Sequence, residues 1–196
     1  MMLRIASAIF LVAFTGATQA PLQQQPFAYA DLGLETDWQA MAAKYPHSSQ
    51  EFWETSTGKI YLLESDGAPK FQQAVRSGSG RYRIRVSQDE ARDGVYFIEL
   101  QITGGKAQSL KLSFEKPEAL VKNQDASFDD RYPPCAPLLA SFTTRFGKHQ
   151  KSRSWSEEAL EQTERTWSSS EEQASVVCGQ YYGRKKVFAL ELTIAR

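Results

Sequence analysis

Apolar and polar residues alternate along three successive segments between residues 80 and 116. The apolar positions are Tyr82, Ile84 and Val86, then Tyr96, Ile98, Leu100 and Ile102, and finally Leu110, Leu112 and Phe114. A period of two residues is typical of a β-strand with one buried and one solvated face. The pattern therefore predicts three consecutive antiparallel strands that share one apolar face.

The loop between the second and third of these strands sets their register. A two-residue loop of Gly104 and Gly105 would turn Leu110 to the opposite face from Ile98, because a shift of one residue exchanges the two faces. A three-residue loop that begins at Thr103 pairs Ile98 with Leu110 and keeps one apolar face. The alternation favours the three-residue loop.

Two other segments have the residue spacing of amphipathic helices. Their apolar stripes are Leu34, Trp38, Met41, Ala42 and Tyr45 in the first, and Leu138, Leu139, Phe142 and Phe146 in the second. Thr36 with Gln39 forms a capping-box pattern at the start of the first helix, and Pro46 ends it. Pro137 suits the first turn of the second helix, and Gly147 suits its left-handed end.

Further strands are expected near both ends of the domain. Three segments have strand composition, and they are residues 59–64, 174–182 and 186–195, the last two forming a hairpin about Gly183. Residues 70–76 fit either a strand or a helical turn. Residues 154–168 divide between a helix that starts at Ser154 and a strand around Trp167.

The first 20 residues have the layout of a secretory signal peptide. Arg4 precedes an apolar run over residues 5–14, which is about half the roughly 20 residues that span a bilayer. Small residues permit cleavage after Ala17 or after Ala20, and Pro21 beside the second position favours Ala17. The alternative is an uncleaved membrane anchor, which so short an apolar run disfavours.

The order of elements after the signal peptide predicts the fold class. Residues 21–35 begin with a Gln- and Pro-rich stretch, which predicts a flexible leader. A helix followed by several strands then occurs twice, over 36–116 and over 135–196, with 117–134 as a connecting loop. The prediction is an α+β fold, mainly antiparallel β-sheet with two short amphipathic helices, compatible with two diverged helix-plus-sheet units.

This outline resembles secreted proteins of the β-lactamase-inhibitor type, and a single unit is similar to small outer-membrane-assembly lipoproteins. The resemblance is architectural. What it implies is the repeated helix-plus-sheet arrangement rather than an activity.

Two cysteines, Cys135 and Cys178, remain in a chain that is expected to be exported. In an oxidising compartment such a pair favours a disulfide, and the alternative is two separate buried thiols. The two cysteines do not form a C-x-x-C pattern, which disfavours a redox-active site. The predicted location is therefore the periplasm or the extracellular space.

The charge balance narrows the class of partner. Lys plus Arg and Asp plus Glu each number 23, so the formal net charge is zero. A protein that coats nucleic acid or an anionic membrane normally carries an excess of positive charge. The sequence therefore predicts no nucleic-acid partner, and no stable membrane span after the signal peptide is removed.

Two groups of residues are candidate contacts for a partner. The first is the row Arg81, Arg83 and Arg85, which the alternation places on the solvated face of one strand. The second is a hairpin tip whose aromatic and basic residues are Tyr181, Tyr182, Arg184 and Lys185. Arginine and tyrosine are common anchors of protein interfaces. The plainer interpretations are a solvated sheet face for the row and a polar turn for the tip.

Candidate catalytic and metal-binding residues are few. A Ser-His-acid site could be assembled from His47, either Ser48 or Ser49, and Glu51, but neighbours in sequence rarely have the necessary geometry. Asp125 and Asp129 lie in the connecting loop and more simply form a solvated turn than a cation site. The sequence predicts no catalytic residue, no metal site and no cofactor.

These observations favour an exported, non-enzymatic protein that binds another protein or an anionic macromolecule. The alternative is a hydrolase of a cell-envelope or extracellular polymer that uses a pair of carboxylates. A third hypothesis is a carrier of a small ligand, which requires a cavity of several hundred Å3 between sheet and helix, as an order of magnitude.

Overall fold

A computed structural model covers the chain and describes residues 26–63, 68–91, 94–114, 132–157, 159–183 and 186–196. The expected signal peptide, most of the expected connecting loop, and Arg184 and Lys185 lie outside the described residues. None of the described helices has the length and apolar character needed to cross a membrane.

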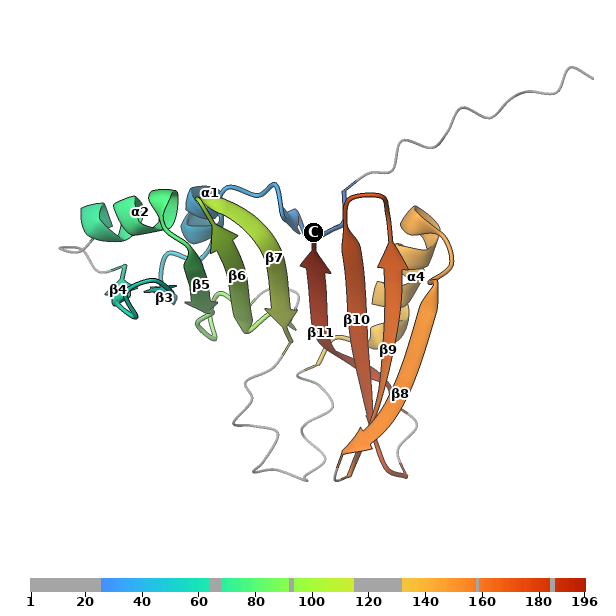
Figure 1. Cartoon of the computed structure of the whole chain (residues 1–196). Helices are drawn as coiled ribbons and strands as arrows, with labels where there is room; N and C mark the ends of the chain where they lie inside the picture. The colour runs from blue at the N-terminus through green and yellow to red at the C-terminus, as the bar shows by residue number, and fades with distance from the viewer. Residues whose placement is uncertain (1–25, 64–67, 92–93, 115–131, 158, 184–185) are drawn as a thin grey trace, which may run out of the picture.

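Nine of the described strands form one antiparallel sheet in the order β4-β3-β5-β6-β7-β11-β10-β9-β8 (Figure 1). Its strands are β3 Ser49–Glu54, β4 Ile60–Leu62, β5 Gly80–Arg85, β6 Phe97–Thr103, β7 Lys106–Ser113, β8 Lys151–Glu157, β9 Leu160–Ser168, β10 Gln173–Tyr181 and β11 Phe188–Ala195. The predicted α+β class with a mainly antiparallel sheet is confirmed.

The strands of the two expected helix-plus-sheet units join into this one sheet. Strand β7 of the first unit pairs with β11 of the second, and Leu110 lies opposite Ile194 while Leu112 lies opposite Leu192. All four side chains are buried in one core cluster that continues from β3 to β9. The two units therefore share a sheet and a core.

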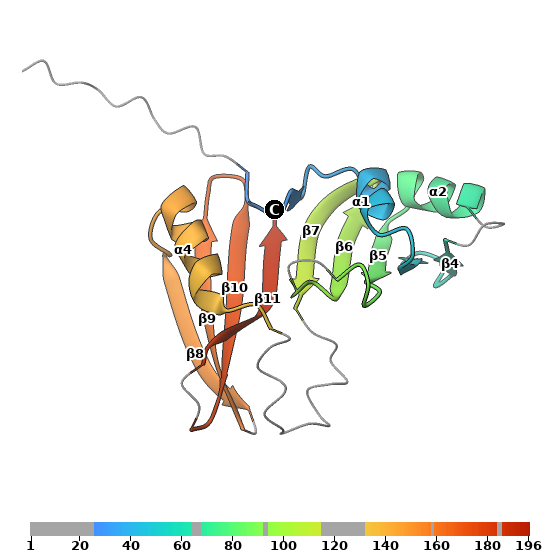
Figure 2. The ribbon, with the colours of Figure 1, turned by 180° about the vertical axis from the view of Figure 1, so that it is seen from behind.

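Three helices cover one face of the sheet, and their bounds are α1 Trp38–Lys44, α2 Ala68–Ser77 and α4 Cys135–Phe146. Figure 2 shows α1 and α4 in front of the sheet, on the face that is turned away in Figure 1. Helix α2 decides the open assignment of residues 70–76 in favour of a helix, and it buries Phe71 and Val75. The described residues therefore contain one helix more than the two predicted.

The helix ends follow the capping signals with one correction. The side chain of Asp37, rather than Thr36, caps α1 by accepting a hydrogen bond from the Gln39 amide. The hydroxyl of Thr36 instead accepts from the amide of Gly33, at 2.9 Å, and so holds the turn that precedes the helix. Helix α4 ends at Gly147, whose φ of 79° is in the left-handed region, as predicted.

The register of β6 and β7 differs from the prediction. A two-residue turn at Gly104 and Gly105, both with positive φ, pairs Leu100 with Leu110 and Ile98 with Leu112. A β-bulge next to Gln101 inserts one extra residue and returns the apolar side chains to one face. The prediction of a three-residue loop is therefore wrong, whereas the predicted apolar face shared by the two strands is present.

The N-terminal segment also differs from the expected flexible leader. Two short strands, β1 Ala28–Tyr29 and β2 Leu32–Gly33, pair with each other. Phe27 and Leu32 are buried, and the ring of Phe27 lies 4.5 Å from that of Phe146 in α4, centroid to centroid. The segment packs between α4 and α1 (Figure 2).

The C-terminal half confirms the hairpin and the disulfide. Strands β8 and β9 occupy residues 151–157 and 160–168, so the helix considered from Ser154 is wrong. Cys135, the first residue of α4, forms a disulfide with Cys178 in β10, with 6.0 Å between their Cα atoms. The bond ties the helix to the sheet beneath it.

Candidate functional site

The face of the sheet opposite the helices, called the outer face below, carries the predicted arginine row. Arg81, Arg83 and Arg85 lie on this face, since Tyr82 and Ile84 between them are buried in the core. Opposite them on β3 lie Trp53, Glu51 and Ser49, in that order. The structure thus places all three arginines together, but it also gives them different surroundings.

Arg83 is held between two carboxylates. Its Nε donates to Glu99 on β6 at 2.7 Å, and its Nη1 lies 3.4 Å from Glu51 on β3. Partial burial alone would lower the pKa of the guanidinium, but the hydrogen bonds and charges of Glu99 and Glu51 outweigh burial and raise the pKa. The positive charge of Arg83 is therefore compensated within the sheet.

Arg81 has a different contact. Its guanidinium carbon lies 5.2 Å from the ring centroid of Trp53, which is a cation–π distance. Among the residues that the structure describes, neither Arg81 nor Arg85 has a carboxylate partner in an ion pair. The side chain of Arg81 therefore leans from β5 toward β3 with its charge uncompensated.

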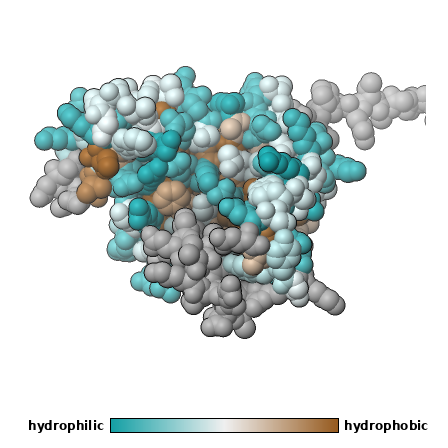
Figure 3. Space-filling model, turned by 60° about the horizontal axis from the view of Figure 1, so that its bottom comes forward, coloured by the Kyte–Doolittle hydropathy of each residue, from teal (hydrophilic) through white to brown (hydrophobic). Residues whose placement is uncertain are grey.

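An apolar patch continues this row to the edge of the sheet. Ile60 on β4 pairs with Trp53 and is 63% exposed, and Leu62 pairs with Glu51 and is 45% exposed. We call Trp53, Ile60, Leu62 and Arg81 the β4 patch. Figure 3 shows apolar surface at the end of the molecule where β4 lies. Exposed apolar residues beside an aromatic ring and an arginine are typical of interaction surfaces.

The sequence contained a signal for this patch that alternation alone did not use. Residues 60–63 are all apolar, so both faces of the strand carry apolar side chains. Tyr61 and Leu63 pack against the core cluster. Ile60 and Leu62 must then project from the other face, where no described element covers them.

The predicted hairpin tip lies elsewhere. Tyr181 packs beside Phe188, with 5.7 Å between ring centroids, and only Tyr182 of the described tip aromatics is exposed, at 52%. Strands β6 and β7 separate this hairpin, which β10 and β11 form, from β5. The tip and the arginine row therefore do not form one surface.

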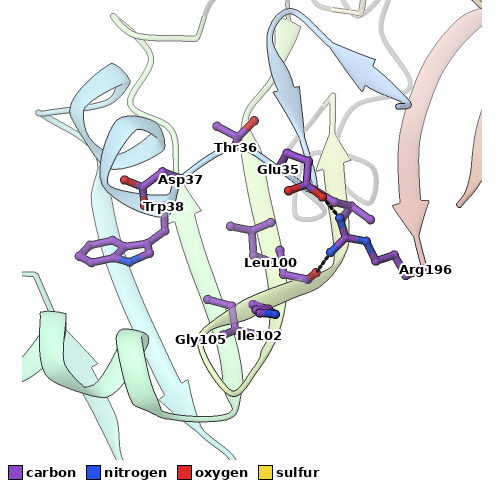
Figure 4. Close-up of a pocket in the computed structure, with 11 residues that line it drawn as sticks. Glu35, Thr36, Asp37, Trp38, Leu100, Ile102, Gly105 and Arg196 are labelled. Carbon is purple, nitrogen blue, oxygen red and sulfur yellow. Dashed lines mark hydrogen bonds and ion pairs between the residues drawn. The ribbon is translucent and has the colours of Figure 1, made fainter. Parts of the chain in front are cut away.

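A pocket of about 390 Å3 lies on the helix side of the sheet (Figure 4). Its apolar residues are Leu34, Trp38, Leu100, Ile102 and Ala107, and its charged residues are Glu35, Asp37, Lys106 and Arg196. Arg196 forms an ion pair with Glu35 and lies 4.0 Å from Glu172, which is buried. The pocket therefore combines an apolar wall with charges of both signs.

The residues considered for a Ser-His-acid site are not brought together, because Glu51 pairs with Arg83 while His47 and Ser48 bind Glu90. The hydroxyl of Ser48 donates to one oxygen of Glu90 at 2.5 Å, and the main-chain amide of His47 donates to the other at 2.9 Å. Desolvation alone would raise the pKa of Glu90, but these hydrogen bonds lower it. In the described part of the chain, no group of three or more His, Cys, Asp or Glu side chains is arranged to hold a metal ion.

Comparison of the chain with protein-family models, with curated proteins and with solved structures finds no match. The resemblance to β-lactamase-inhibitor-type proteins therefore stays a prediction.

Proposed function

We propose that the protein is an exported, non-enzymatic binding protein that holds another protein at the β4 patch. The observation that carries this proposal is the exposure of Ile60 and Leu62 beside Trp53 and the uncompensated Arg81. Burying such apolar surface stabilises a complex, and tryptophan and arginine are the residue types that dominate interface energies. The disulfide and the signal-peptide pattern support a periplasmic or extracellular location.

A protein partner fits this surface better than a polyanion. The carboxylates of Glu51 and Glu99 flank Arg83 on the outer face, so a polyanion that followed the arginine row would meet two negative charges. A protein can place an apolar residue on Ile60 and a single acidic residue near Arg81. The mixture of apolar and local charged contacts supports the protein.

The test compares capture of envelope or secreted proteins by three forms of the mature protein. They are the wild type, the double variant Ile60→Thr and Leu62→Thr, and the control Val187→Thr, which alters an exposed apolar residue on the other half of the molecule. We expect one or more proteins to be captured by the wild type and the control but not by the double variant, and then to bind in purified form. Equal capture by all three would overturn the proposal.

The pocket supports a second candidate function, which is binding of a small ligand. Its volume of about 390 Å3 is in the range of ligand sites in proteins, roughly 300 to 1,000 Å3. Native mass spectrometry of protein purified from its own compartment tests this candidate. A bound molecule that is present in the wild type and lost from Ala107→Leu, which narrows the pocket, would support it.

The hydrolase alternative has less support. It needs two carboxylates that face one cleft and are free to exchange protons with a substrate. Glu35 and Asp37 line the pocket, but Glu35 is engaged by Arg196 and Asp37 caps α1. We therefore assign no residue to a hydrolytic role.

A further inference from the structure

The hydrogen bonds between β3 and β4 show which main-chain groups of β4 face outward. The amide of Leu63 donates to the carbonyl of Gln50, and the amide of Glu54 donates to the carbonyl of Lys59. In an antiparallel pair, hydrogen-bonded and non-hydrogen-bonded positions alternate. Tyr61, which lies between these two pairs, therefore bonds to β3, whereas the amides and carbonyls of Ile60 and Leu62 point away from it.

These outward groups have no hydrogen-bond partner within the described chain. Strand β4 is the last strand of the sheet on its side, so nothing in the sheet order covers it. The same two residues carry the exposed apolar side chains of the β4 patch. Free main-chain groups and apolar side chains therefore occur on the same two residues.

The opposite edge of the sheet is different in character. Strand β8 exposes the charged side chains of Lys151, Arg153 and Glu157, and its other residues are three serines and Trp155, over whose ring Arg153 lies. Charged side chains on an edge strand discourage pairing with another strand. Strand β4 has no charged residue, and its protection is limited to its short length.

We propose that β4 accepts an extended segment of the partner protein as an additional antiparallel strand. This inference rests on the proposed function and specifies how the partner binds. A residue opposite Ile60 and a residue opposite Leu62 would each exchange two main-chain hydrogen bonds with β4. The side chains at those two positions would lie on the outer face and would be apolar, because Ile60 and Leu62 are their neighbours.

Arg81 adds a charge requirement to this segment. Its guanidinium lies over Trp53 on β3, which places it two strand spacings, about 10 Å, from a strand added beyond β4. A glutamate on the added segment can cover much of that distance, and the arginine side chain can cover the rest. The segment is therefore an extended one with alternate apolar residues and at least one acidic residue on the same face.

The probe for the test is a fluorescent ten-residue synthetic peptide. Its alternate positions, which share one face of an extended strand, carry isoleucine except for one that carries glutamate. Its control is the same peptide with N-methylated amides along one edge, which keeps the side chains but cannot form the main-chain hydrogen bonds. Fluorescence anisotropy measures binding to the intact mature protein. We expect the methylated peptide to bind at least about tenfold more weakly.

Two protein variants separate side-chain contact from strand addition. Leu62→Thr retains the outward amide, whereas Leu62→Pro removes it without removing a bond to β3. We expect the proline variant to bind the peptide at least about tenfold more weakly than the threonine variant. Hydrogen exchange of the Ile60 and Leu62 amides in the wild type should slow on peptide addition, and this readout does not depend on how either variant folds.

The outcomes distinguish this inference from the function on which it rests. If capture of the natural partner is lost in the Ile60→Thr and Leu62→Thr variant but the two amides are not protected, strand addition is overturned and the patch remains. If neither result is obtained, both proposals fail. A concentration-dependent dimer that Leu62→Pro abolishes would also overturn the inference, because a second copy would then occupy β4.

Discussion

The hydroxyl of Tyr82 is buried and joins three elements through one glutamine. It donates to Oε1 of Gln50 at 2.6 Å, and Nε2 of Gln50 donates to the carbonyls of Ala42 and Tyr45 at the end of α1. Burial raises the pKa of Tyr82, so the phenol is neutral and can donate this hydrogen bond at neutral pH. This network fixes α1 on β3 and β5.

Tyr82→Phe is expected to lower the free energy of unfolding by about 1 to 2 kcal/mol, because Oε1 of Gln50 then remains buried without a donor. Urea denaturation at neutral pH measures the change. Tyr61→Phe is the matched control, since its hydroxyl bonds to Glu54 at 3.3 Å in a more exposed position, and it should have little effect. An equal loss in both variants would contradict the role of burial.

The hydrogen bonds that His47 and Ser48 donate to Glu90 predict that the stability of the protein depends on pH. Because the folded-state pKa of Glu90 is lowered, its contribution to stability is present above the unfolded-state value, which is about 4.3, and is lost as the pH falls through the folded-state value. The difference in stability between the wild type and Glu90→Gln should therefore shrink on acidification from pH 6 to about pH 3. Denaturation curves at several pH values measure this difference in the free energy of unfolding. A difference that stays constant with pH would contradict a stabilising role for the hydrogen bonds to Glu90.

Single residues also show how far sequence reasoning extends at this scale. Alternation identified Tyr82 and Ile84 as buried and the intervening arginines as solvated. It could not show that Arg83 is compensated and Arg81 is not, because Glu99 and Glu51 come from other strands. Local patterns determine which face a side chain takes, and tertiary pairing determines what it meets there.

At the scale of elements, the turn between β6 and β7 also separates what local sequence patterns determine from what strand pairing determines. Two consecutive glycines fit both a two-residue turn and part of a longer loop, and the apolar pattern alone excluded the shorter one. The bulge beside Gln101 adds one residue to β7 and restores the pattern. A bulge has no strong sequence signal, so the face was predictable and the exact pairing was not.

Opposite Val177 and Cys178 of β10, a second bulge leaves Leu190 of β11 as the extra residue, and this leucine lies close to Gly179. A Cβ atom on Gly179 would lie 2.7 Å from Cδ1 of Leu190 and 3.1 Å from the ring of Phe188. Gly179→Ala should lower the free energy of unfolding by about 1 to 3 kcal/mol through overpacking. Thermal or urea unfolding measures the loss.

The same substitution in a Leu190→Ala background provides the control. Removing Cδ1 of Leu190 creates space for the new methyl group, so the cost of Gly179→Ala should be smaller there. An unchanged cost would mean that the ring of Phe188, rather than the side chain of Leu190, limits the space at Gly179. This double-mutant cycle therefore isolates the contact.

At the scale of the whole molecule, the disulfide was predictable because export and two cysteines left few alternatives. The bond closes a loop of 43 residues between α4 and β10. Replacing both cysteines by serine should lower the free energy of unfolding by about 4 kcal/mol in the loop-entropy model. Denaturation of the double variant and of the disulfide-bonded wild type measures this loss, and the reduced wild type is the control for the double variant. The reduced wild type and the double variant should have similar free energies of unfolding. A double variant as stable as the disulfide-bonded wild type would contradict the model.

The pairing that joins the strands of the two halves into one sheet was not predictable from the sequence of either half. Each half contains at least one helix and a set of strands, and alternation says nothing about which strand edges pair. The pairing of β7 with β11 removes one edge from each set. The N-terminal segment, whose Gln- and Pro-rich start predicted flexibility, packs against α4 through Phe27 and against Phe114 of the first half through Tyr29.

The continuous sheet and core predict that the protein unfolds as one unit, although a helix followed by strands occurs twice along the chain. Phe27→Ala should lower the free energy of unfolding by about 3 to 5 kcal/mol, because the ring is buried between Phe142 and Phe146. Since the sheet and the core are continuous, the variant should still show one transition, with equal calorimetric and van't Hoff enthalpies. Two separate transitions would show that the halves are independent and that the pairing of β7 with β11 contributes little.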